Sequence, residues 1–329
     1  MSRPRRSHLV SLWASILLAL VSSRCGGGGS PSNPISSLPT PAPTATPVAD
    51  PDPTIAAAGD IACDSTNSGP TICQQFATSE LIVRMQPTAV LALGDLAYEN
   101  GRIEEFQRFY DPSWGRLKPI TRPAPGNHEY QTFADARGYF EYFNGNARSG
   151  GVAGSPGEGW YSFDIGSWHL VALNSNCQHV GGCGQNSAQD RWLRADLRAN
   201  RTTCTLAFWH HPRFSSGASG NNPMMEGLWQ TLQEEGADVV LSGHDHVYER
   251  FSPQTSNGTS NRERGLRQIV VGTGGRDLTA FVSSQANSEV KGASSFGILK
   301  MRLRPRSYEW EFLPAPGYSF RDSGSDVCH

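Results

Sequence analysis

Short apolar runs alternate with segments of helical periodicity along most of the chain. Residues 54–58 and 88–93 are apolar runs that are each followed by Gly-Asp, and the 73–85 segment between them places apolar residues near helical spacing. Strand, helix and strand in this order predict a parallel strand pair. Residues 160–175 predict a hairpin that turns at 165–167.

The downstream segments continue this alternation. Residues 187–198 place Trp192, Leu193 and Leu197 on one side and charges on the other, which is typical of a surface helix. The remaining predicted elements are a helix over 223–235, short strands over 205–209, 237–241 and 268–271, and a final hairpin of 298–303 with 308–313. Strands that alternate with helices and are mixed with hairpins predict an α/β layered fold with a mixed sheet.

The beginning of the chain differs from this pattern and predicts an export signal. Three arginines stand among the first six residues, and an apolar run over 9–21 follows them. This charge order is typical of a secretory signal peptide, here over 1–25. The apolar run is shorter than the ~20 residues that a membrane-spanning helix needs.

Cys25 leaves two ways of processing open. It occupies the position of the lipidated cysteine of a bacterial lipoprotein, but Arg24 stands where such signals have a small residue, so ordinary cleavage near Ser23 is the alternative. Residues 26–53 are rich in Pro, Gly and Ser and predict an extended linker. We therefore expect one folded domain over 54–329 that is secreted, periplasmic or held at the cell surface, with a lipid on Cys25 as its only attachment to the membrane.

Charge narrows the range of functions. The chain has 28 Lys+Arg and 30 Asp+Glu, which gives a net charge of −2. Proteins that bind nucleic acids usually carry a strong basic excess, so no nucleic acid is expected as a structural partner.

The cysteines agree with export. Besides Cys25 there are six, and an even number in an exported chain predicts three disulfides, for which sequence alone allows 15 connectivities. Cys63–Cys73 and Cys177–Cys183 are close in sequence and each bracket a turn-rich loop, which would leave Cys204–Cys328 as the third pair. A zinc cluster is disfavoured because no CxxC spacing occurs.

Residues with metal-ligand chemistry fall mostly just after the predicted strands. They are Asp60, Asp95, Asn127, His128, His210, His211, His244, Asp245 and His246. Side chains at the carboxyl ends of strands in α/β sheets collect at one edge, so these distant segments are expected to share one site. Carboxylate, amide and imidazole ligands suit Fe, Zn or Mn better than Ca.

The number of candidate ligands predicts two metal ions. Six or more exceed what one tetrahedral zinc needs and suit two ions that share a bridging carboxylate. Two ions ~3.5–4 Å apart can clamp a phosphoryl group and lower the pKa of bound water to ~7, which supplies hydroxide. No Ser-His-Asp pattern with a GxSxG elbow is present. Metal-activated hydroxide would make a protein nucleophile unnecessary.

Spacing predicts how the histidines face. His210 and His211 are adjacent, so on a strand they point to opposite sides and only one should bind metal. His244 and His246 share a face at period two, which a single site needs. Asp245 between them points away and is expected to anchor the loop.

The motifs that carry these residues resemble those of the calcineurin-like metallophosphoesterase superfamily. They read in order Gly59-Asp60, Gly94-Asp95-Leu96-Ala97-Tyr98, Gly126-Asn127-His128-Glu129, Trp209-His210-His211-Pro212 and Gly243-His244-Asp245-His246-Val247-Tyr248-Glu249-Arg250. Over roughly 54–313 the set is most similar to the purple acid phosphatases. The resemblance implies a four-layer α/β/β/α sandwich with two mixed β-sheets.

The resemblance also implies a role for each motif residue. Asp95 bridges two metals, Asp60, Tyr98 and His246 complete one site, and Asn127, His210 and His244 complete the other. His128 is a non-ligand that protonates the leaving group or holds a phosphate oxygen. Tyr98 implies Fe³⁺ in the first site, with Fe²⁺, Zn²⁺ or Mn²⁺ in the second.

Two departures accompany the resemblance. Many relatives without the tyrosine have Asp-x-His at the first motif, but Ala62 stands here, which agrees with Tyr98 as the replacement ligand. Purple acid phosphatases commonly have further histidines shortly after His-x-Pro, and 213–222 contains none. His211 and Arg250 are predicted as substrate contacts, and a local salt bridge is the alternative for Arg250.

These observations predict an exported phosphoesterase that hydrolyses a small phosphomonoester by metal-activated hydroxide. A phosphodiesterase with the same metal centre is the alternative enzyme. A surface binding protein that keeps the fold without turnover is the alternative from another class.

Overall fold

The computed structural model describes residues 52–67, 73–145 and 150–329. The predicted export signal at 1–25, with Cys25, and the predicted linker up to residue 51 lie outside these described residues. Within the described ranges, no helix combines the length and the apolar character that a membrane crossing requires.

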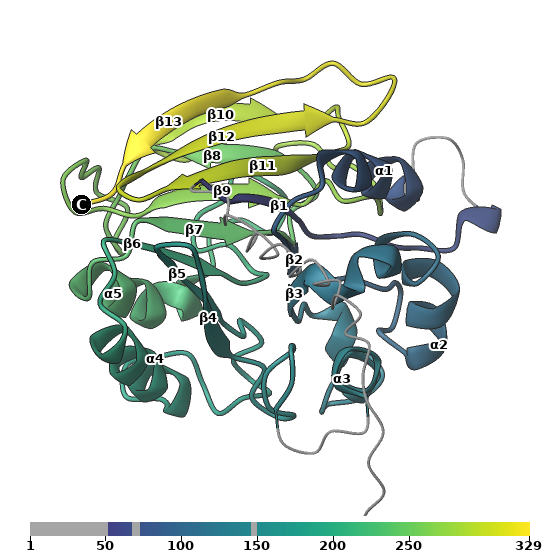
Figure 1. The fold of residues 1–329 in the computed structure, drawn as a ribbon, viewed down its shortest axis with the longest axis horizontal. Coiled ribbons are helices and arrows are strands. Elements are labelled where there is room, and N and C mark those ends of the chain that lie inside the picture. The colour runs from purple at the N-terminus through teal and green to yellow at the C-terminus, as the bar shows by residue number, and fades with distance from the viewer. Residues whose placement is uncertain (1–51, 68–72, 146–149) are drawn as a thin grey trace, which may run out of the picture. The chain divides into compact units, whose positions relative to one another are not determined.

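Two mixed β-sheets form the centre of the domain (Figure 1). The six-stranded sheet runs β13 (Ser323–Val327), β12 (Ser307–Pro314), β11 (Gly297–Arg304), β1 (Thr54–Ala58), β2 (Ala89–Leu93), β3 (Thr121–Ala124). The seven-stranded sheet runs β10 (Ser288–Gly292), β8 (Tyr248–Phe251), β9 (Arg267–Val271), β7 (Val239–Ser242), β6 (Cys204–Phe208), β5 (Trp168–Ala172), β4 (Tyr161–Ile165). β1, β2 and β3 are parallel, as are β5, β6, β7 and β9. The parallel strands of each sheet therefore end at a common edge.

Helices cover the outer sides of the sheets. They are α1 (Gln75–Met85), α2 (Ile103–Glu105), α3 (Arg137–Asn144), α4 (Ala188–Ala199) and α5 (Glu226–Glu234), with a π-helical turn at Phe106–Tyr110 and 3₁₀ turns at Ser65–Asn67, Trp114–Ile120, His128–Tyr130 and Pro223–Met225. In Figure 1, α4 and α5 lie beside the seven-stranded sheet, and α1, α2 and α3 lie on the side of the other. This is the predicted α/β/β/α sandwich with two mixed sheets.

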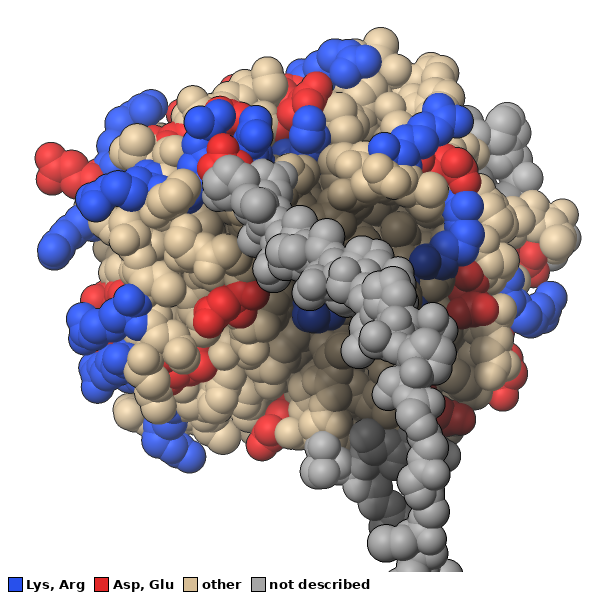
Figure 2. Space-filling view, in the orientation of Figure 1, with Lys and Arg blue, Asp and Glu red and all other residues tan. Residues whose placement is uncertain are grey.

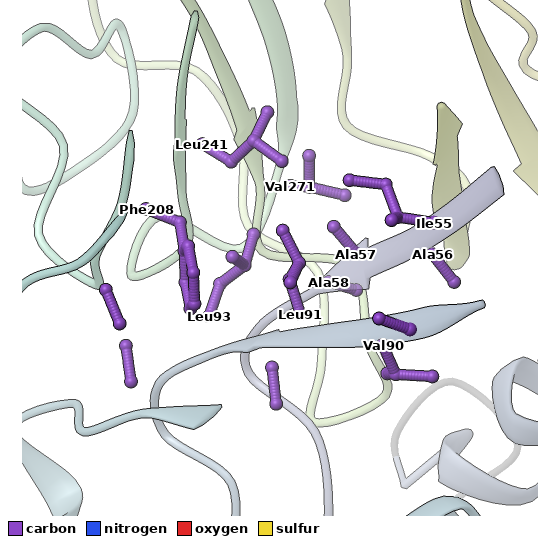
Figure 3. Packing of buried hydrophobic residues seen from close by; sticks show 14 of the residues in the cluster. Ile55, Ala56, Ala57, Ala58, Val90, Leu91, Leu93, Phe208, Leu241 and Val271 are labelled. Atoms are coloured by element: carbon purple, nitrogen blue, oxygen red, sulfur yellow. The ribbon is translucent and has the colours of Figure 1, made fainter. Parts of the chain in front are cut away.

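Apolar side chains of the parallel strands fill the space between the sheets. Figure 3 shows Leu91 and Leu93 of β2 near Phe208, Leu241 and Val271 of the seven-stranded sheet, and all five are fully buried. Burying one such side chain stabilises the fold by ~1.5–3 kcal/mol. This inter-sheet core holds the ends of both sets of parallel strands in one place.

A second core lies on the opposite face of the seven-stranded sheet. Val171, Ala207 and Val240 alternate along their strands with the inter-sheet residues and pack with Leu193 of α4 and Trp229 of α5. Burial on both faces explains why these strands read as continuous apolar runs in the sequence.

Charged side chains of both signs are interspersed on the face drawn in Figure 2. Among the described residues, oppositely charged side chains form surface pairs, such as Arg304 with Glu309 and Arg194 with Glu234, both at 2.8 Å. Exposed pairs of this kind contribute ~0–1 kcal/mol each, so the stability of the domain depends on its two cores.

The elements predicted from apolar runs are confirmed within a few residues, and the missed strands are edge or polar strands. β3 contains Pro123, which cannot donate to a ladder and is tolerated because β3 lies at the edge of its sheet. β10 and β13 are edge strands with few apolar residues. The predicted final hairpin of β11 and β12 is extended by β13, so it is a three-stranded unit.

All three suggested disulfides are present, which decides among the 15 connectivities. Cys63–Cys73, Cys177–Cys183 and Cys204–Cys328 are bonded. The first two close short loops, and the third joins β6 to the C-terminal end, 124 residues later. A loop of this size removes much conformational freedom from the unfolded chain, ~4.7 kcal/mol for about 100 residues in the entropy account.

His169 joins the seven-stranded sheet to α4. Its Nδ1 is 2.7 Å from Asp164 Oδ1 on β4, and its Nε2 is 2.8 Å from Asp196 Oδ2 on α4. Burial alone would lower the pKa of His169, but the hydrogen bonds and charges of Asp196 and Asp164 raise it above its usual value. The protonated imidazole is therefore stabilised by folding.

A His169→Gln variant should show this dependence on pH. A raised folded-state pKa contributes stability below the ordinary imidazole pKa of ~6.5, and this contribution is lost as the pH rises through the folded-state value. The difference in melting temperature between wild type and variant should be larger at pH 6 than at pH 9. His179→Gln, which changes an exposed histidine, is the control, and a gap that does not change with pH would contradict the assignment.

Candidate metal centre

Side chains from both sheets meet at the carboxyl ends of the parallel strands. We call Asp60, Asp95, Tyr98, Asn127, His210, His244 and His246 the rim cluster. Asp60 follows β1, Asp95 and Tyr98 follow β2, Asn127 follows β3, His210 follows β6, and His244 and His246 follow β7. The structure thus brings together all seven residues that the sequence predicts as metal ligands.

One half of the rim cluster is built around the phenol of Tyr98. Its oxygen is 3.0 Å from Asp60 Oδ1 and 3.2 Å from Asp95 Oδ2. His246 Nε2 lies 3.2 Å from the phenol oxygen and 3.2 Å from Asp60 Oδ1. Burial and the charges of Asp60 and Asp95 raise the pKa of Tyr98 well above its usual value. A phenolate here requires a strong positive charge beside it.

The other half is built around Nε2 of His210. This nitrogen is 3.2 Å from Asp95 Oδ2, 3.2 Å from Asn127 Oδ1 and 3.2 Å from His244 Nδ1. Asp95 Oδ2 belongs to both halves, as the shared carboxylate of a two-ion centre would.

Hydrogen bonds outside the rim cluster decide which ring nitrogens keep a lone pair. His210 Nδ1 is 2.8 Å from the carbonyl oxygen of Leu93, which only accepts, so the proton is on Nδ1. His246 Nδ1 is 2.5 Å from Asp277 Oδ1 and is protonated for the same reason. When these rings are neutral, as metal ligands must be, the Nε2 lone pair of His210 faces Asp95 Oδ2 and that of His246 faces Asp60 Oδ1. Lone pairs that face carboxylate oxygens need cations between them, so the donor set fits metal ions.

The pKa values reflect the same demand for positive charge. Burial lowers the pKa of His210, but Asp95 and Asp60 outweigh it and raise it to about 9. Burial also lowers the pKa of His246, and Asp60 and Asp277 raise it to about 10. Burial raises the pKa of Asp95, yet the charge and hydrogen bond of His210 bring it well below its usual range.

Three residues of the rim cluster have a strained backbone. Asp60, Asp95 and His244 have φ values of 61°, 51° and 72°, in the left-handed region that residues other than glycine rarely adopt. The Asp60 carboxylate compensates by accepting the His244 N–H at 2.8 Å. Strain of this kind costs of order 1–3 kcal/mol and clusters at functional sites.

Glu129 holds the loop conformations below the rim cluster. Its carboxylate accepts the backbone N–H groups of Asp95 at 2.9 Å, Leu96 at 2.9 Å and Gly126 at 2.7 Å. Gly126 leaves no room for a side chain, because a Cβ there would lie 2.1 Å from Asp95 Oδ1. Glu129 thereby ties the loop after β2 to the loop after β3, a role that the motif alone does not disclose.

His128 lies beside the rim cluster. Its backbone N–H donates to Asp95 Oδ1 at 2.8 Å, and its ring is 4.4 Å from the Tyr98 ring between centroids. His128 Nε2 is 3.9 Å from Asp95 Oδ2, too long for a hydrogen bond. The partly exposed ring is thus adjacent to both halves without contacting the shared carboxylate oxygen.

The expectation that His211 faces away from His210 is wrong. β6 ends at Phe208, so both histidines lie in the following loop, where the alternation of a strand does not apply. One ring nitrogen of each of His210, His211 and His244 lies within 4.8 Å of the others. His211 therefore lies beside His210 and His244, and burial together with these two histidines lowers its pKa well below the usual value.

The structure does not bring Arg250 into the rim cluster. Arg250 is on β8, where its Nε is 2.7 Å from Asp322 and its guanidinium also pairs with Glu289. The same group lies 5.0 Å from the Trp310 ring centroid. These partners tie β8 to β10 and to the C-terminal strands, which agrees with the alternative of a local salt bridge, and a substrate contact stays a prediction.

Asp245 does anchor the loop between His244 and His246. It accepts the backbone N–H of Ser219 at 2.9 Å and the Ser215 hydroxyl.

Asp277 was missed by sequence reasoning because it follows a glycine-rich turn and carries no motif. Its only signal is a position after β9, at the same edge as the other strand ends.

Comparison with known proteins agrees with this geometry. The sequence model of the calcineurin-like phosphoesterase family matches residues 53–248. Purple acid phosphatase 15 of Arabidopsis thaliana is 28% identical over 59% of this chain and 41% of its own length, and human acid phosphatase type 7 is 28% identical over 59% and 50%. The chain thus spans about half the length of these curated relatives. The solved purple acid phosphatase PPD1 of yellow lupin (Lupinus luteus) has a TM-score of 0.67 at 20% identity, covering 83% of this chain and 53% of its own, which shows a shared fold.

Replacing Asp277 by Asn should weaken metal binding through His246. The Asn side chain is neutral, so the His246 Nδ1–H would lose its hydrogen bond to a carboxylate. Changes to such partners of a metal-binding histidine typically cost 10–100-fold in metal affinity. Competition with a chelator should show one zinc ion bound that much more weakly, whereas Asp135→Asn, an exposed acid paired with Arg137, should leave affinity unchanged. Equal zinc affinity in all three proteins would contradict this role for Asp277.

Proposed function

Because this chain belongs to the calcineurin-like phosphoesterase family, we propose that it is an exported phosphoesterase that hydrolyses phosphomonoesters at a two-metal centre. The proposal depends mainly on one observation, which is that the Asp95 carboxylate belongs to both halves of the rim cluster. Its Oδ2 is 3.2 Å from Tyr98 in one half of the rim cluster and 3.2 Å from His210 in the other. One carboxylate common to two sets of ligands is the arrangement that a pair of neighbouring ions requires.

The two halves differ in chemistry, which supports a mixed pair of ions. Asp60, Tyr98 and His246 would hold Fe³⁺ with Asp95, because a phenolate stabilises the ferric state. Asn127, His210 and His244 would hold Fe²⁺, Zn²⁺ or Mn²⁺ with the same carboxylate, since neutral imidazole and amide ligands suit divalent ions. When bound, the pair supplies positive charge for the phosphoryl oxygens and activates a water for in-line attack.

His128 is the residue that we assign to the leaving group. Its Nδ1 lies 2.6 Å from the carbonyl oxygen of Glu99, so the ring carries a proton there. A doubly protonated ring would keep Nδ1–H on that carbonyl and give its Nε2 proton to the ester oxygen as the P–O bond breaks. The side chain is 22% exposed, which leaves it accessible to a substrate.

Export is supported by the three disulfides, because such bonds persist in oxidising compartments. The proposed partner is a small phosphoester and not a nucleic acid. A lipid on Cys25 would be the proposed attachment to the membrane if the signal is processed as that of a lipoprotein.

Asp95→Asn and His244→Ala should each lower turnover of p-nitrophenyl phosphate by at least ~100-fold, because each removes a ligand needed for charge stabilisation. Metal analysis should show fewer than two ions per chain in both variants. Glu309→Gln, which changes only a surface pair with Arg304, should keep wild-type turnover.

Three outcomes of this assay would contradict the proposal in different ways. Wild-type turnover in both site variants would remove the metal centre from the reaction. Hydrolysis of bis-p-nitrophenyl phosphate without hydrolysis of the monoester would identify a phosphodiesterase. Absence of turnover with Fe, Zn and Mn supplied would favour a binding protein on this fold.

The visible spectrum tests the assignment of Tyr98. A protein with Fe³⁺ next to the phenolate should absorb in the visible range by charge transfer, and Tyr98→Phe should abolish the band while Tyr318→Phe, a partly exposed tyrosine on the C-terminal segment, should keep it. An active, colourless wild type loaded with zinc or manganese would contradict the ferric assignment.

A further inference from the structure

His211 is a third imidazole beside His210 and His244 and belongs to neither half of the rim cluster. Its ring centroid is 4.3 Å from that of His244 and 4.9 Å from that of His210. His210 is fully buried, whereas His211 is partly exposed. Of His210 and His211, His211 is therefore the one that a small molecule can reach.

The backbone and ring of His211 are held in place from two sides. Its backbone N–H donates to Ser175 Oγ at 3.0 Å, and its carbonyl oxygen accepts the Trp209 indole N–H at 2.8 Å. Ser175 Oγ is also 2.8 Å from His211 Nδ1. Ser175 comes from the loop after β5, so a separate element orients this ring.

These contacts favour one position for the ring proton. The Ser175 hydroxyl accepts the backbone N–H and has one proton to donate. Among the contacts of Ser175 Oγ with the described residues, His211 Nδ1 is the atom that can accept this proton. Nδ1 is then the acceptor, and the proton of the neutral ring is on Nε2. A nitrogen that carries a proton cannot bind a metal, but it can donate a hydrogen bond.

We propose that His211 is a substrate-binding residue that donates its Nε2–H to a phosphoryl oxygen, and that it is not a third histidine ligand. The inference rests on the proposed function, because it assigns the donor for the phosphoryl group at that same centre. His210 and His244 offer lone pairs to cations, whereas the ring beside them offers a proton to an anion. Ser175 is the positioning residue, since it acts only through the tautomer and orientation of His211.

The test compares two variants of His211, each of which has an amide group near the position of one ring nitrogen. His211→Gln places an amide N–H near the position of Nε2, and His211→Asn places its amide near Nδ1. A hydrogen bond to a charged group that is lost costs about 10–100-fold in affinity. Calorimetric binding of inorganic phosphate to the metal-loaded protein should weaken by that factor in His211→Asn and recover largely in His211→Gln.

Ser175→Ala and His329→Asn complete the set. Ser175→Ala should weaken phosphate binding by a smaller factor, because the ring remains but both tautomers become available. His329→Asn changes a histidine paired with Asp238 at the C-terminal end and should bind phosphate like wild type. All variants should keep two ions per chain by metal analysis and melt near the wild-type temperature.

The outcomes are distinct from those that test the proposed function. Loss of an ion in His211→Asn would overturn the inference by making His211 a ligand. Unchanged phosphate affinity in that variant would overturn it by leaving the ring a packing role. A wild type that binds phosphate but does not hydrolyse esters would remove the proposed function and leave the anion-binding role of His211 intact.

Discussion

The structure depends on one buried carboxylate, that of Asp95, which both halves of the rim cluster share. Its Oδ2 contacts the Tyr98 phenol and the His210 ring, and its Oδ1 accepts the His128 backbone N–H. A buried charge is costly unless it is compensated. Here the Tyr98 hydroxyl and the His128 backbone N–H donate to it, and the positive charge of protonated His210 from the opposite sheet lies 3.2 Å away and lowers the pKa of Asp95. The two sheets must therefore end at the same place for either half to exist.

The inter-sheet core makes that coincidence possible. Leu93 of β2 and Phe208 of β6 belong to the same hydrophobic core. Each is the last residue of its strand and leads into the loop that carries Asp95 or His210 of the rim cluster. Packing at native density transmits position, so the loops begin from fixed points. Asp60 and Asp95 then have a left-handed backbone where they enter the rim cluster, and Glu129 holds the loop that carries Asp95.

We propose that the histidines of the rim cluster and His211 differ in function because of the residues that they contact outside the cluster. Leu93 and Asp277 place the proton of His210 and His246 away from the pocket, which leaves lone pairs for cations. Ser175 does the reverse for His211. One residue type thus provides both ligands and a hydrogen-bond donor within a few ångströms, and the difference is decided by hydrogen-bond partners outside the pocket.

The sequence by itself determined the strand ends that carry the chemistry. Apolar runs before Asp60 and Asp95, and the ordered motifs around Asn127 and His244, were sufficient because burial on both faces and adjacency along the chain are local properties. Only the tertiary structure decided that Asp277 contacts His246, that Ser175 contacts the His211 ring, and that Arg250 is held by Asp322. Each of these pairs joins segments that are far apart in the chain. Their meeting depends on sheet order and loop path, which no local pattern of residues encodes.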